Sequence, residues 1–181
     1  MNDRKVTVIE VGPRDGLQNE KSLLSTAFKV ELILRLESCG FAEVEATSMV
    51  HPKWVPQLAD AFEVMEILAR TPGPGTRTVL VPNLKGLDRA LQAGVKRVAV
   101  FVAASESFSR KNTNRSVAEG MEEAAQVVRA AKTSGVTARG YLSTAFVCPF
   151  EGAIAPEISA KLTQGLLAMG CDEVSLGDTI G

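Results

Sequence analysis

Short apolar runs alternate with longer segments of helical periodicity along the chain. Runs rich in β-branched residues predict six strands, at 6–11, 43–46, 78–81, 97–102, 137–142 and 173–176. Between them, apolar residues recur at the spacing of a helix face, as at Phe28, Leu32 and Leu36, at Met121, Ala124, Val128 and Ala131, and at Ile158, Leu162, Leu166 and Met169. This alternation predicts an α/β fold with parallel strands, arranged either as a doubly wound sheet or as a barrel.

An internal repeat supports the same organisation. Gly40, Gly94 and Gly170 are each followed by two linking residues, a charged residue and a β-branched strand. A glycine in this place is typical of a helix end, so each copy marks the passage from a helix into the next strand. Ser116 with Glu119 three residues later predicts a capping box at the start of another helix.

The composition refines this picture. With 181 residues, 45% hydrophobic and 23% charged, the chain predicts a single domain over residues 1–181. The net charge of −1, without clusters of Lys or Arg, argues against nucleic-acid and membrane partners. The longest apolar stretches fall well short of the ~20 residues of a membrane-spanning helix, so we expect a soluble protein. No leader pattern precedes the first strand, which favours a cytoplasmic location.

The three cysteines, Cys39, Cys148 and Cys171, are widely spaced and form no Cys-x-x-Cys pair. This spacing argues for free thiols rather than for a disulfide framework or a zinc site. Cys39 and Cys171 flank the glycines expected to end helices, and we expect both to be small buried side chains.

Polar side chains occur at the carboxyl end of every predicted strand. They are Arg14, Asp15 and Gln18, then Glu45, Thr47 and Ser48, then Asn83, then Ser105 and Glu106, then Ser143 and Thr144, and finally Asp178 and Thr179. In a barrel, the carboxyl ends of all strands meet at one mouth, where such enzymes keep their catalytic groups. The Arg14-Asp15 pair is the strongest of these signals, because Gly12-Pro13 stops the first strand immediately before it.

Several motifs at these positions resemble the 3-hydroxy-3-methylglutaryl-CoA (HMG-CoA) lyase family. They are Gly12-Pro13-Arg14-Asp15-Gly16-Leu17-Gln18-Asn19-Glu20, Pro52-Lys53-Trp54-Val55-Pro56-Gln57, Asn83-Leu84-Lys85-Gly86 and Ser175-Leu176-Gly177-Asp178-Thr179-Ile180-Gly181. The first alone indicates the wider superfamily of metal-dependent acyl-CoA lyases and Claisen-type synthases, whereas the second and third narrow the resemblance to the lyase. The resemblance selects the (β/α)8 TIM barrel. We expect an incomplete one, with about six βα units and strands 7 and 8 missing.

The resemblance also implies roles for four residues in cleaving HMG-CoA to acetyl-CoA and acetoacetate, a reaction of leucine catabolism and ketone-body formation. Arg14 resembles the catalytic arginine that stabilises the departing enolate. Asp15 resembles a ligand of a divalent metal, Mg²⁺ or Mn²⁺. Glu45 is assigned to the orientation of Arg14, and Asp178 to proton handling or positioning near the substrate hydroxyl.

Substrate contacts follow from the same resemblance. Arg14, Gln18 and Ser48 are expected to contact the acyl-CoA, and Lys21 to contact its phosphates. His51, the only histidine, is expected to be an exposed loop residue rather than a metal ligand. The family completes its metal site and supplies a mobile-loop cysteine beyond the sixth strand, so we expect residues 1–181 alone to have little activity.

Two alternatives remain open at this point. The chain is also compatible with another acyl-CoA lyase or Claisen-type synthase of the superfamily. The other alternative is a non-catalytic truncated remnant that binds acyl-CoA weakly or only pairs with other subunits. For the complete form, the family resemblance implies a homodimer.

Overall fold

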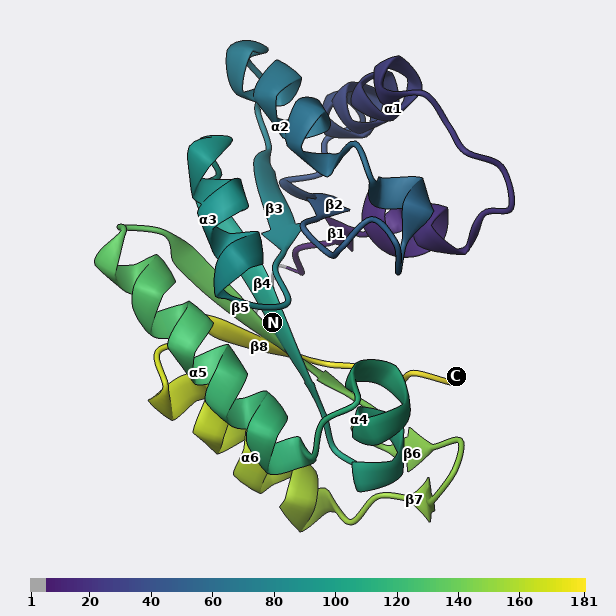
Figure 1. Cartoon of the computed structure of the whole chain (residues 1–181), viewed down its shortest axis with the longest axis vertical. Coiled ribbons are helices and arrows are strands. Elements are labelled where there is room, and N and C mark those ends of the chain that lie inside the picture. The colour runs from purple at the N-terminus through teal and green to yellow at the C-terminus, as the bar shows by residue number, and fades with distance from the viewer. Residues whose placement is uncertain (1–5) are drawn as a thin grey trace, which may run out of the picture. The chain divides into compact units, whose positions relative to one another are not determined.

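The computed structural model describes residues 6–181, which form two compact units (Figure 1). Unit 1 comprises the described residues up to Leu80 together with Asp88–Arg97. Unit 2 comprises Val81–Leu87 and Val98–Gly181. Both units are built from strands that alternate with helices, as the sequence pattern predicts.

Unit 1 contains three strands in the order β1-β2-β3, paired in parallel. Its elements are β1 (Ile9–Glu10), a π-helical turn (Gly12–Gly16), a 3-10 turn (Leu17–Asn19), α1 (Thr26–Ser38), β2 (Glu43–Ser48), a second 3-10 turn (Pro56–Leu58), α2 (Ala61–Arg70) and β3 (Thr76–Leu80). The helix α3 (Leu84–Gln92) begins in unit 2 and ends in unit 1. Every residue of β2 is buried, so this strand forms the centre of the unit.

The face that α1 buries differs from the predicted one. Phe28, expected in the core, is 48% exposed. The helix instead buries Lys29, Val30, Ile33 and Glu37. The Lys29 ammonium contacts the Asp60 carboxylate at 2.6 Å, and the Glu37 carboxylate accepts two hydrogen bonds from Arg77 at 2.6 and 2.8 Å. Two ion pairs thus allow charged side chains to be buried beside Val30 and Ile33 on the face that packs inward.

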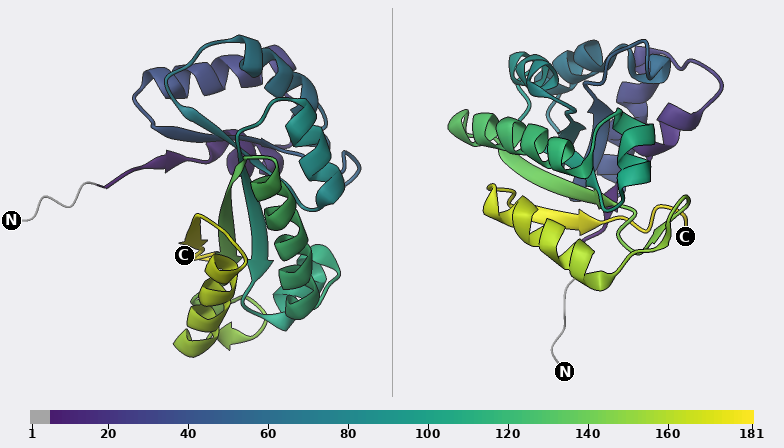
Figure 2. Two further views of the ribbon diagram at one scale, coloured as in Figure 1. Left: turned by 90° about the vertical axis from the view of Figure 1, so that its left-hand side faces the viewer. Right: turned by 60° about the horizontal axis from the view of Figure 1, so that its bottom comes forward.

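Unit 2 contains a sheet in the order β4-β5-β8, with β5 and β8 parallel. Its elements are β4 (Arg97–Ala103), α4 (Glu106–Thr113), α5 (Val117–Thr133), β5 (Thr137–Ser143), the antiparallel pair β6 (Val147–Cys148) and β7 (Gly152–Ala153), α6 (Pro156–Ala168) and β8 (Glu173–Leu176). The helices α5 and α6 lie side by side and pack on β5 (Figure 2). The capping box of Ser116 and Glu119 is confirmed at the start of α5.

Most predicted strands are found within two residues of their expected bounds, with two larger differences. The first strand is shorter than expected, since β1 covers only Ile9–Glu10, and the β6–β7 hairpin was not predicted. The repeat glycines Gly40, Gly94 and Gly170 have φ values of 95°, 76° and 111°, which confirms that each ends a helix in a conformation that glycine tolerates best.

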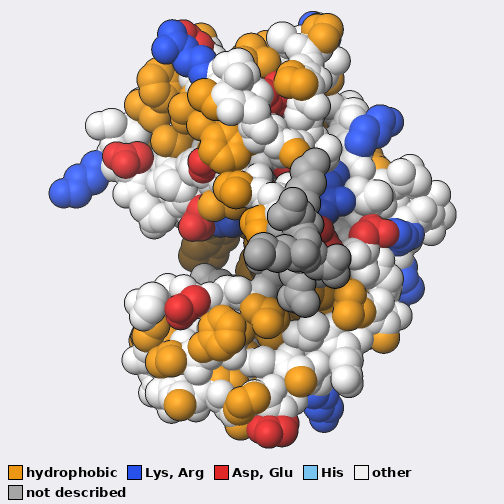
Figure 3. Space-filling view, turned by 180° about the vertical axis from the view of Figure 1, so that it is seen from behind, with side chains coloured by type: hydrophobic (Ala, Val, Ile, Leu, Met, Phe, Trp, Pro, Cys, Tyr) orange, Lys and Arg blue, Asp and Glu red, His pale blue; other side chains and the backbone are white. Residues whose placement is uncertain are grey.

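Apolar side chains fill the interior, but several remain on the surface. Figure 3 shows hydrophobic side chains scattered over the face in view. Ile158 of α6 was predicted to be buried and is 45% exposed, whereas Leu166 of the same helix is fully buried. Among residues 6–181, no helix has both the length and the apolar character needed to cross a membrane.

The cysteines are free thiols, as predicted, but their burial differs from expectation at one position. Cys39 is exposed, because it follows the last turn of α1 on the solvent side, so the prediction of a buried side chain is wrong there. Cys171 is buried as expected. Burial, with a smaller contribution from the Asp172 carboxylate, raises the pKa of the Cys171 thiol to about 11.

Candidate active site

The first strand leads directly into a π-helical turn, Gly12–Gly16, that carries the Arg-Asp pair. The backbone N–H groups of Arg14 and Asp15 both donate to the carbonyl of Val11, at 3.1 and 2.7 Å. The carboxylate of Glu10 accepts the first N–H of the turn at 2.6 Å. π-Helical turns are rare overall, but they occur often at functional sites. This one brings Arg14 onto the neighbouring strand β2.

Two carboxylates hold the Arg14 guanidinium. Its Nε donates to Oε1 of Glu45, and its Nη1 donates to Oδ1 of Asp15 at 2.7 Å. The Glu45 side chain is completely buried in β2, and the Arg14 side chain is only 13% exposed. The predicted contact between Glu45 and Arg14 is therefore present, and it fixes the guanidinium against the sheet.

Asp15 differs from Glu45 in its accessibility, since its side chain is 53% exposed. Its Oδ1 accepts a second hydrogen bond, from Nε2 of Gln18 at 3.0 Å, so the residues predicted to bind metal and substrate lie together. Asn19 donates to the Asp15 carbonyl at 2.8 Å and closes the segment. The result is an arginine, an accessible carboxylate and an amide within one short loop.

The other residues predicted for this side of the site are placed by β2 and its loop. Ser48 is buried at the end of β2, where its hydroxyl accepts the N–H of Val50 at 3.2 Å. Lys21 is exposed just beyond the Arg14 segment. His51 is exposed in the loop after β2, as predicted, and its Nδ1 accepts the N–H of Lys53 at 3.2 Å.

No sequence pattern predicts the contacts that anchor the Arg14 segment at its far end. Gln57 donates from Nε2 to the Glu20 carbonyl at 2.7 Å. The carbonyl of Gln57 in turn accepts from the buried ammonium of Lys29, which also contacts Asp60. The segment is thus connected to α1 and to the loop before α2 by residues whose spacing along the sequence does not predict their contact.

Unit 2 carries the remaining predicted residues at the ends of its own strands. Asp178 follows β8 and is exposed, and no described residue forms a hydrogen bond with its carboxylate. Its neighbour Thr179 accepts the backbone N–H of Thr144, which follows β5, at 2.7 Å. The role of Asp178 stays a prediction.

A buried thiol lies behind the end of β4. The Ser105 hydroxyl donates to Sγ of Cys148 at 2.9 Å, and the N–H of Phe150 donates to it at 3.4 Å. Burial acts to raise the pKa of the Cys148 thiol, but the hydrogen bonds from Ser105, Phe150 and Glu151 outweigh it and the pKa falls below its ordinary value. Glu151 also accepts the N–H of Ser107, and this hydrogen bond lowers the Glu151 pKa. The network orders the loop rather than exposing a nucleophile.

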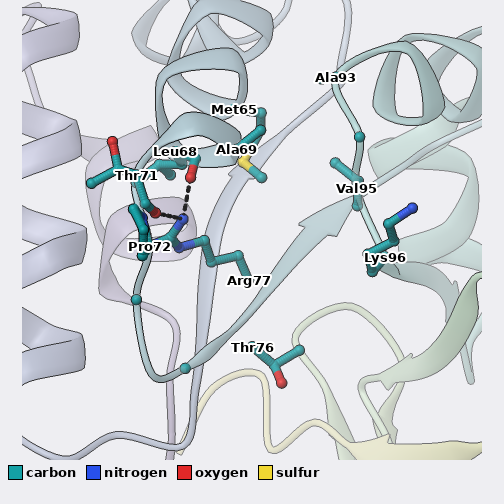
Figure 4. Close-up of a pocket in the computed structure, with 13 residues that line it drawn as sticks. Met65, Leu68, Ala69, Thr71, Pro72, Thr76, Arg77, Ala93, Val95 and Lys96 are labelled. Atoms are coloured by element: carbon teal, nitrogen blue, oxygen red, sulfur yellow. Dashed lines mark hydrogen bonds between the residues drawn. The ribbon is translucent and has the colours of Figure 1, made fainter.

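A separate cavity of about 390 Å³ lies in unit 1, beside the start of β3 (Figure 4). Arg77 is its main charged group, and its Nη1 donates to the carbonyls of Leu68 and Thr71. The guanidinium also forms the two hydrogen bonds with Glu37 described above. Because these contacts satisfy Arg77, and because the Arg14 segment follows the opposite end of the strands, the cavity is not part of the candidate site.

Comparison with known proteins decides the family. The chain matches the HMGL-like family over residues 5–181. The chain belongs to the HMGL-like family. It is 49% identical over 178 residues to the mitochondrial hydroxymethylglutaryl-CoA lyase of Bos taurus, covering 98% of this chain and 54% of the bovine protein. The chain therefore spans about half the length of the curated relatives it matches.

Solved structures of HMG-CoA lyases agree with this HMGL-like assignment. The hydroxymethylglutaryl-CoA lyase of Pseudomonas aeruginosa matches with a TM-score of 0.93 and 48% identity, over 98% of this chain and 59% of that one. An HMG-CoA lyase of Acinetobacter baumannii, solved with coenzyme A and 3-methylmalate, matches with a TM-score of 0.90 and 34% identity, over 97% and 57%. The prediction of six βα units from an incomplete (β/α)8 barrel is confirmed.

Proposed function

We propose that the chain supplies the Arg14 side of an HMG-CoA lyase active site, which cleaves HMG-CoA to acetyl-CoA and acetoacetate. The observation that carries this proposal is the guanidinium of Arg14, held between the buried Glu45 and the accessible Asp15. Membership of the HMGL-like family supports it, and the coenzyme A bound to the Acinetobacter baumannii relative supports an acyl-CoA substrate.

The chemistry of the cleavage explains the need for a fixed arginine. When the carbon–carbon bond breaks, negative charge develops on the thioester oxygen of the departing enolate. A guanidinium offers directed donors to that oxygen, and it stabilises the charge most when it needs no reorganisation during the reaction. Glu45 supplies that fixed position, because it is completely buried and bonds Nε of Arg14.

Other residues take supporting roles in the proposal. Asp178 handles the proton of the substrate hydroxyl or positions that group. Gln18 and Ser48 contact the acyl portion, and the exposed Lys21 contacts the phosphates of CoA. These roles rest on the family resemblance, on the placement of Ser48 and Asp178 at strand ends, and on that of Gln18 and Lys21 in the segment that follows β1.

Asp15 is proposed as one ligand of Mg²⁺ or Mn²⁺. Its accessible carboxylate suits a hard cation, and Oδ2 accepts no hydrogen bond from a described residue. The part of the chain that the structure describes holds no group of three or more His, Cys, Asp or Glu side chains suited to a metal, so Asp15 does not make a complete site by itself.

A Mn²⁺ titration tests this ligand assignment. We expect residues 1–181 to bind Mn²⁺ only weakly, and Asp15→Asn to remove what binding there is. Electron paramagnetic resonance of free Mn²⁺ measures both. One tight site that persists in Asp15→Asn would contradict the assignment.

The proposed function also implies a metabolic role and an oligomeric state. The reaction belongs to leucine catabolism and ketone-body formation, and the complete form is proposed to be a homodimer. The names of curated relatives include mitochondrial and cytoplasmic forms, so the cytoplasmic location stays a prediction. Sedimentation of the complete form measures the oligomeric state.

A chimera provides the decisive experiment. We would replace the matched part of the Pseudomonas aeruginosa lyase with residues 1–181 and assay the release of acetoacetate from HMG-CoA. We expect turnover by the chimera and little or none by residues 1–181 alone. A folded chimera that cleaves only another branched acyl-CoA would overturn the substrate, and one that binds acyl-CoA without turnover would favour a non-catalytic role.

A further inference from the structure

The pairing between β5 and the segment after β8 contains one extra residue. Gly177 donates to the carbonyl of Leu142 at 2.8 Å, and its own carbonyl accepts the N–H of Ala145 at 3.1 Å. In a regular parallel ladder, one residue bonds through its N–H and its carbonyl to two residues of the neighbouring strand, and a single residue lies between those two. Here Ser143 and Thr144 both lie between them. The strand therefore bulges at its carboxyl end.

The extra residue, Thr144, has an unfavourable backbone conformation. Its φ is 52°, in the left-handed region that β-branched residues rarely adopt, and its side chain is completely buried. Such strain persists only where the surroundings impose it, and it is commonest at functional sites. The Thr144 hydroxyl donates to the adjacent Ser143 carbonyl, so the side chain is satisfied locally.

The bulge redirects one backbone donor away from the sheet. Because Ala145 takes the ladder bond to Gly177, the N–H of Thr144 points elsewhere and donates to Oγ1 of Thr179 at 2.7 Å. A buried N–H that loses its acceptor destabilises the fold, so this contact fixes both partners. Thr179 is itself exposed.

We infer that Thr179 is a positioning residue for Asp178, holding the β8 loop on β5 through the N–H of Thr144. This inference rests on the role proposed above for Asp178. The Asp178 carboxylate has no hydrogen-bond partner among residues 6–181, so the backbone on either side must set its position. Gly177 anchors one side through the ladder, and the Thr179 hydroxyl anchors the other.

Amide hydrogen exchange tests the anchor independently of any activity. In residues 1–181, Thr179→Val removes the acceptor while keeping the side-chain shape, and Thr179→Ser keeps the acceptor. We expect the valine variant to lower the protection of the Thr144 amide about tenfold or more, with the Gly177 and Ala145 amides unchanged. The serine variant should resemble the native chain. Equal protection in the valine and native chains, or loss at all three amides together, would overturn the inference.

Kinetics in the chimera test the link to Asp178. Thr179→Val should lower kcat about tenfold or more with KM changed less than about twofold, because a misplaced group impairs the reaction more than binding. Thr179→Ser should restore kcat. A valine variant with native kcat would overturn the positioning role even if the exchange result holds. If the chimera without substitutions is inactive, the proposed function fails, and the exchange experiment still decides whether the anchor exists.

Discussion

The two units hold the polar groups at their strand ends by different forces. In unit 1, the guanidinium of Arg14 lies between the carboxylates of Glu45 and Asp15. In unit 2, a neutral N–H to hydroxyl contact fixes Thr179. Charged groups in unit 1 are therefore mutually dependent, so that removal of one leaves a buried charge behind. Single neutral contacts in unit 2 can be lost one at a time at smaller cost.

The largest effect on stability is expected from Glu45→Ala. The substitution removes the buried carboxylate that Arg14 contacts, which should lower the free energy of unfolding by about 3 kcal/mol. Urea unfolding followed by circular dichroism measures the change. The matched control is Glu31→Ala, which removes an exposed partner of Arg35 and should cost about 0.5 kcal/mol or less. Equal losses in the two variants would show that burial does not distinguish these pairs.

The next effect concerns turnover by the chimera. Arg14→Lys keeps the charge but cannot reproduce the directed donors, so kcat should fall on the order of 10²–10³-fold with little change in KM. Steady-state kinetics with HMG-CoA test this. Arg35→Lys, on the exposed face of α1, should leave kcat unchanged. A native kcat in Arg14→Lys would mean that a point charge suffices.

A smaller effect is expected from the capping box in unit 2. Hydrogen bonds from the backbone and side chain of Ser116 lower the Glu119 pKa, so the folded state favours the ionised carboxylate. The resulting stabilisation is present above the unfolded-state pKa and is lost as the pH falls through the lower, folded-state pKa. Ser116→Ala should cost about 1 kcal/mol near neutral pH.

Acid unfolding of the Glu119→Gln variant isolates the carboxylate. We expect this variant to lose less stability than the native chain between neutral pH and pH 3, because its side chain cannot titrate. Thermal unfolding over this range measures the difference. Identical pH profiles for the two chains would contradict the assigned shift.

The smallest effect distinguishes the units by thiol reactivity. Cys39 of unit 1 is exposed, whereas Cys148 and Cys171 of unit 2 are buried. Ellman's reagent should modify one thiol rapidly in the folded chain and the other two only as the protein unfolds. Cys39→Ser should abolish the rapid phase. Rapid reaction in that variant would show that the lowered pKa of Cys148 outweighs its burial.

Much of the fold was predictable because β-branched runs and repeat glycines mark the βα units directly. Strands such as β8 begin and end where the pattern predicts. The first strand is shorter because Gly12-Pro13 and the π-helical turn take over its end. The β6–β7 hairpin escaped prediction because two-residue strands have no periodicity to detect.

The candidate site was predictable only in part. The contact of Arg14 with Glu45 is present, and it follows from the place of Arg14 just after β1 and of Glu45 on the neighbouring parallel strand β2. The contact between Thr144 and Thr179 depends on a bulge and a positive φ, which no residue type in that stretch requires. Local chemistry can thus be inferred from side chains, whereas backbone irregularities need coordinates.

The buried charges of α1 have a consequence for folding, because they disfavour packing of this helix at the wrong position in the sheet. Each helix of a βα unit packs on a strand, and a purely apolar face would fit several positions in a sheet. Lys29 and Glu37 match only a partner surface that presents Asp60 and Arg77. An incorrect docking leaves both charges desolvated and unpaired, and is therefore disfavoured. These residues therefore specify the docking position of α1. Replacing α1 with a generic amphipathic helix should be poorly tolerated.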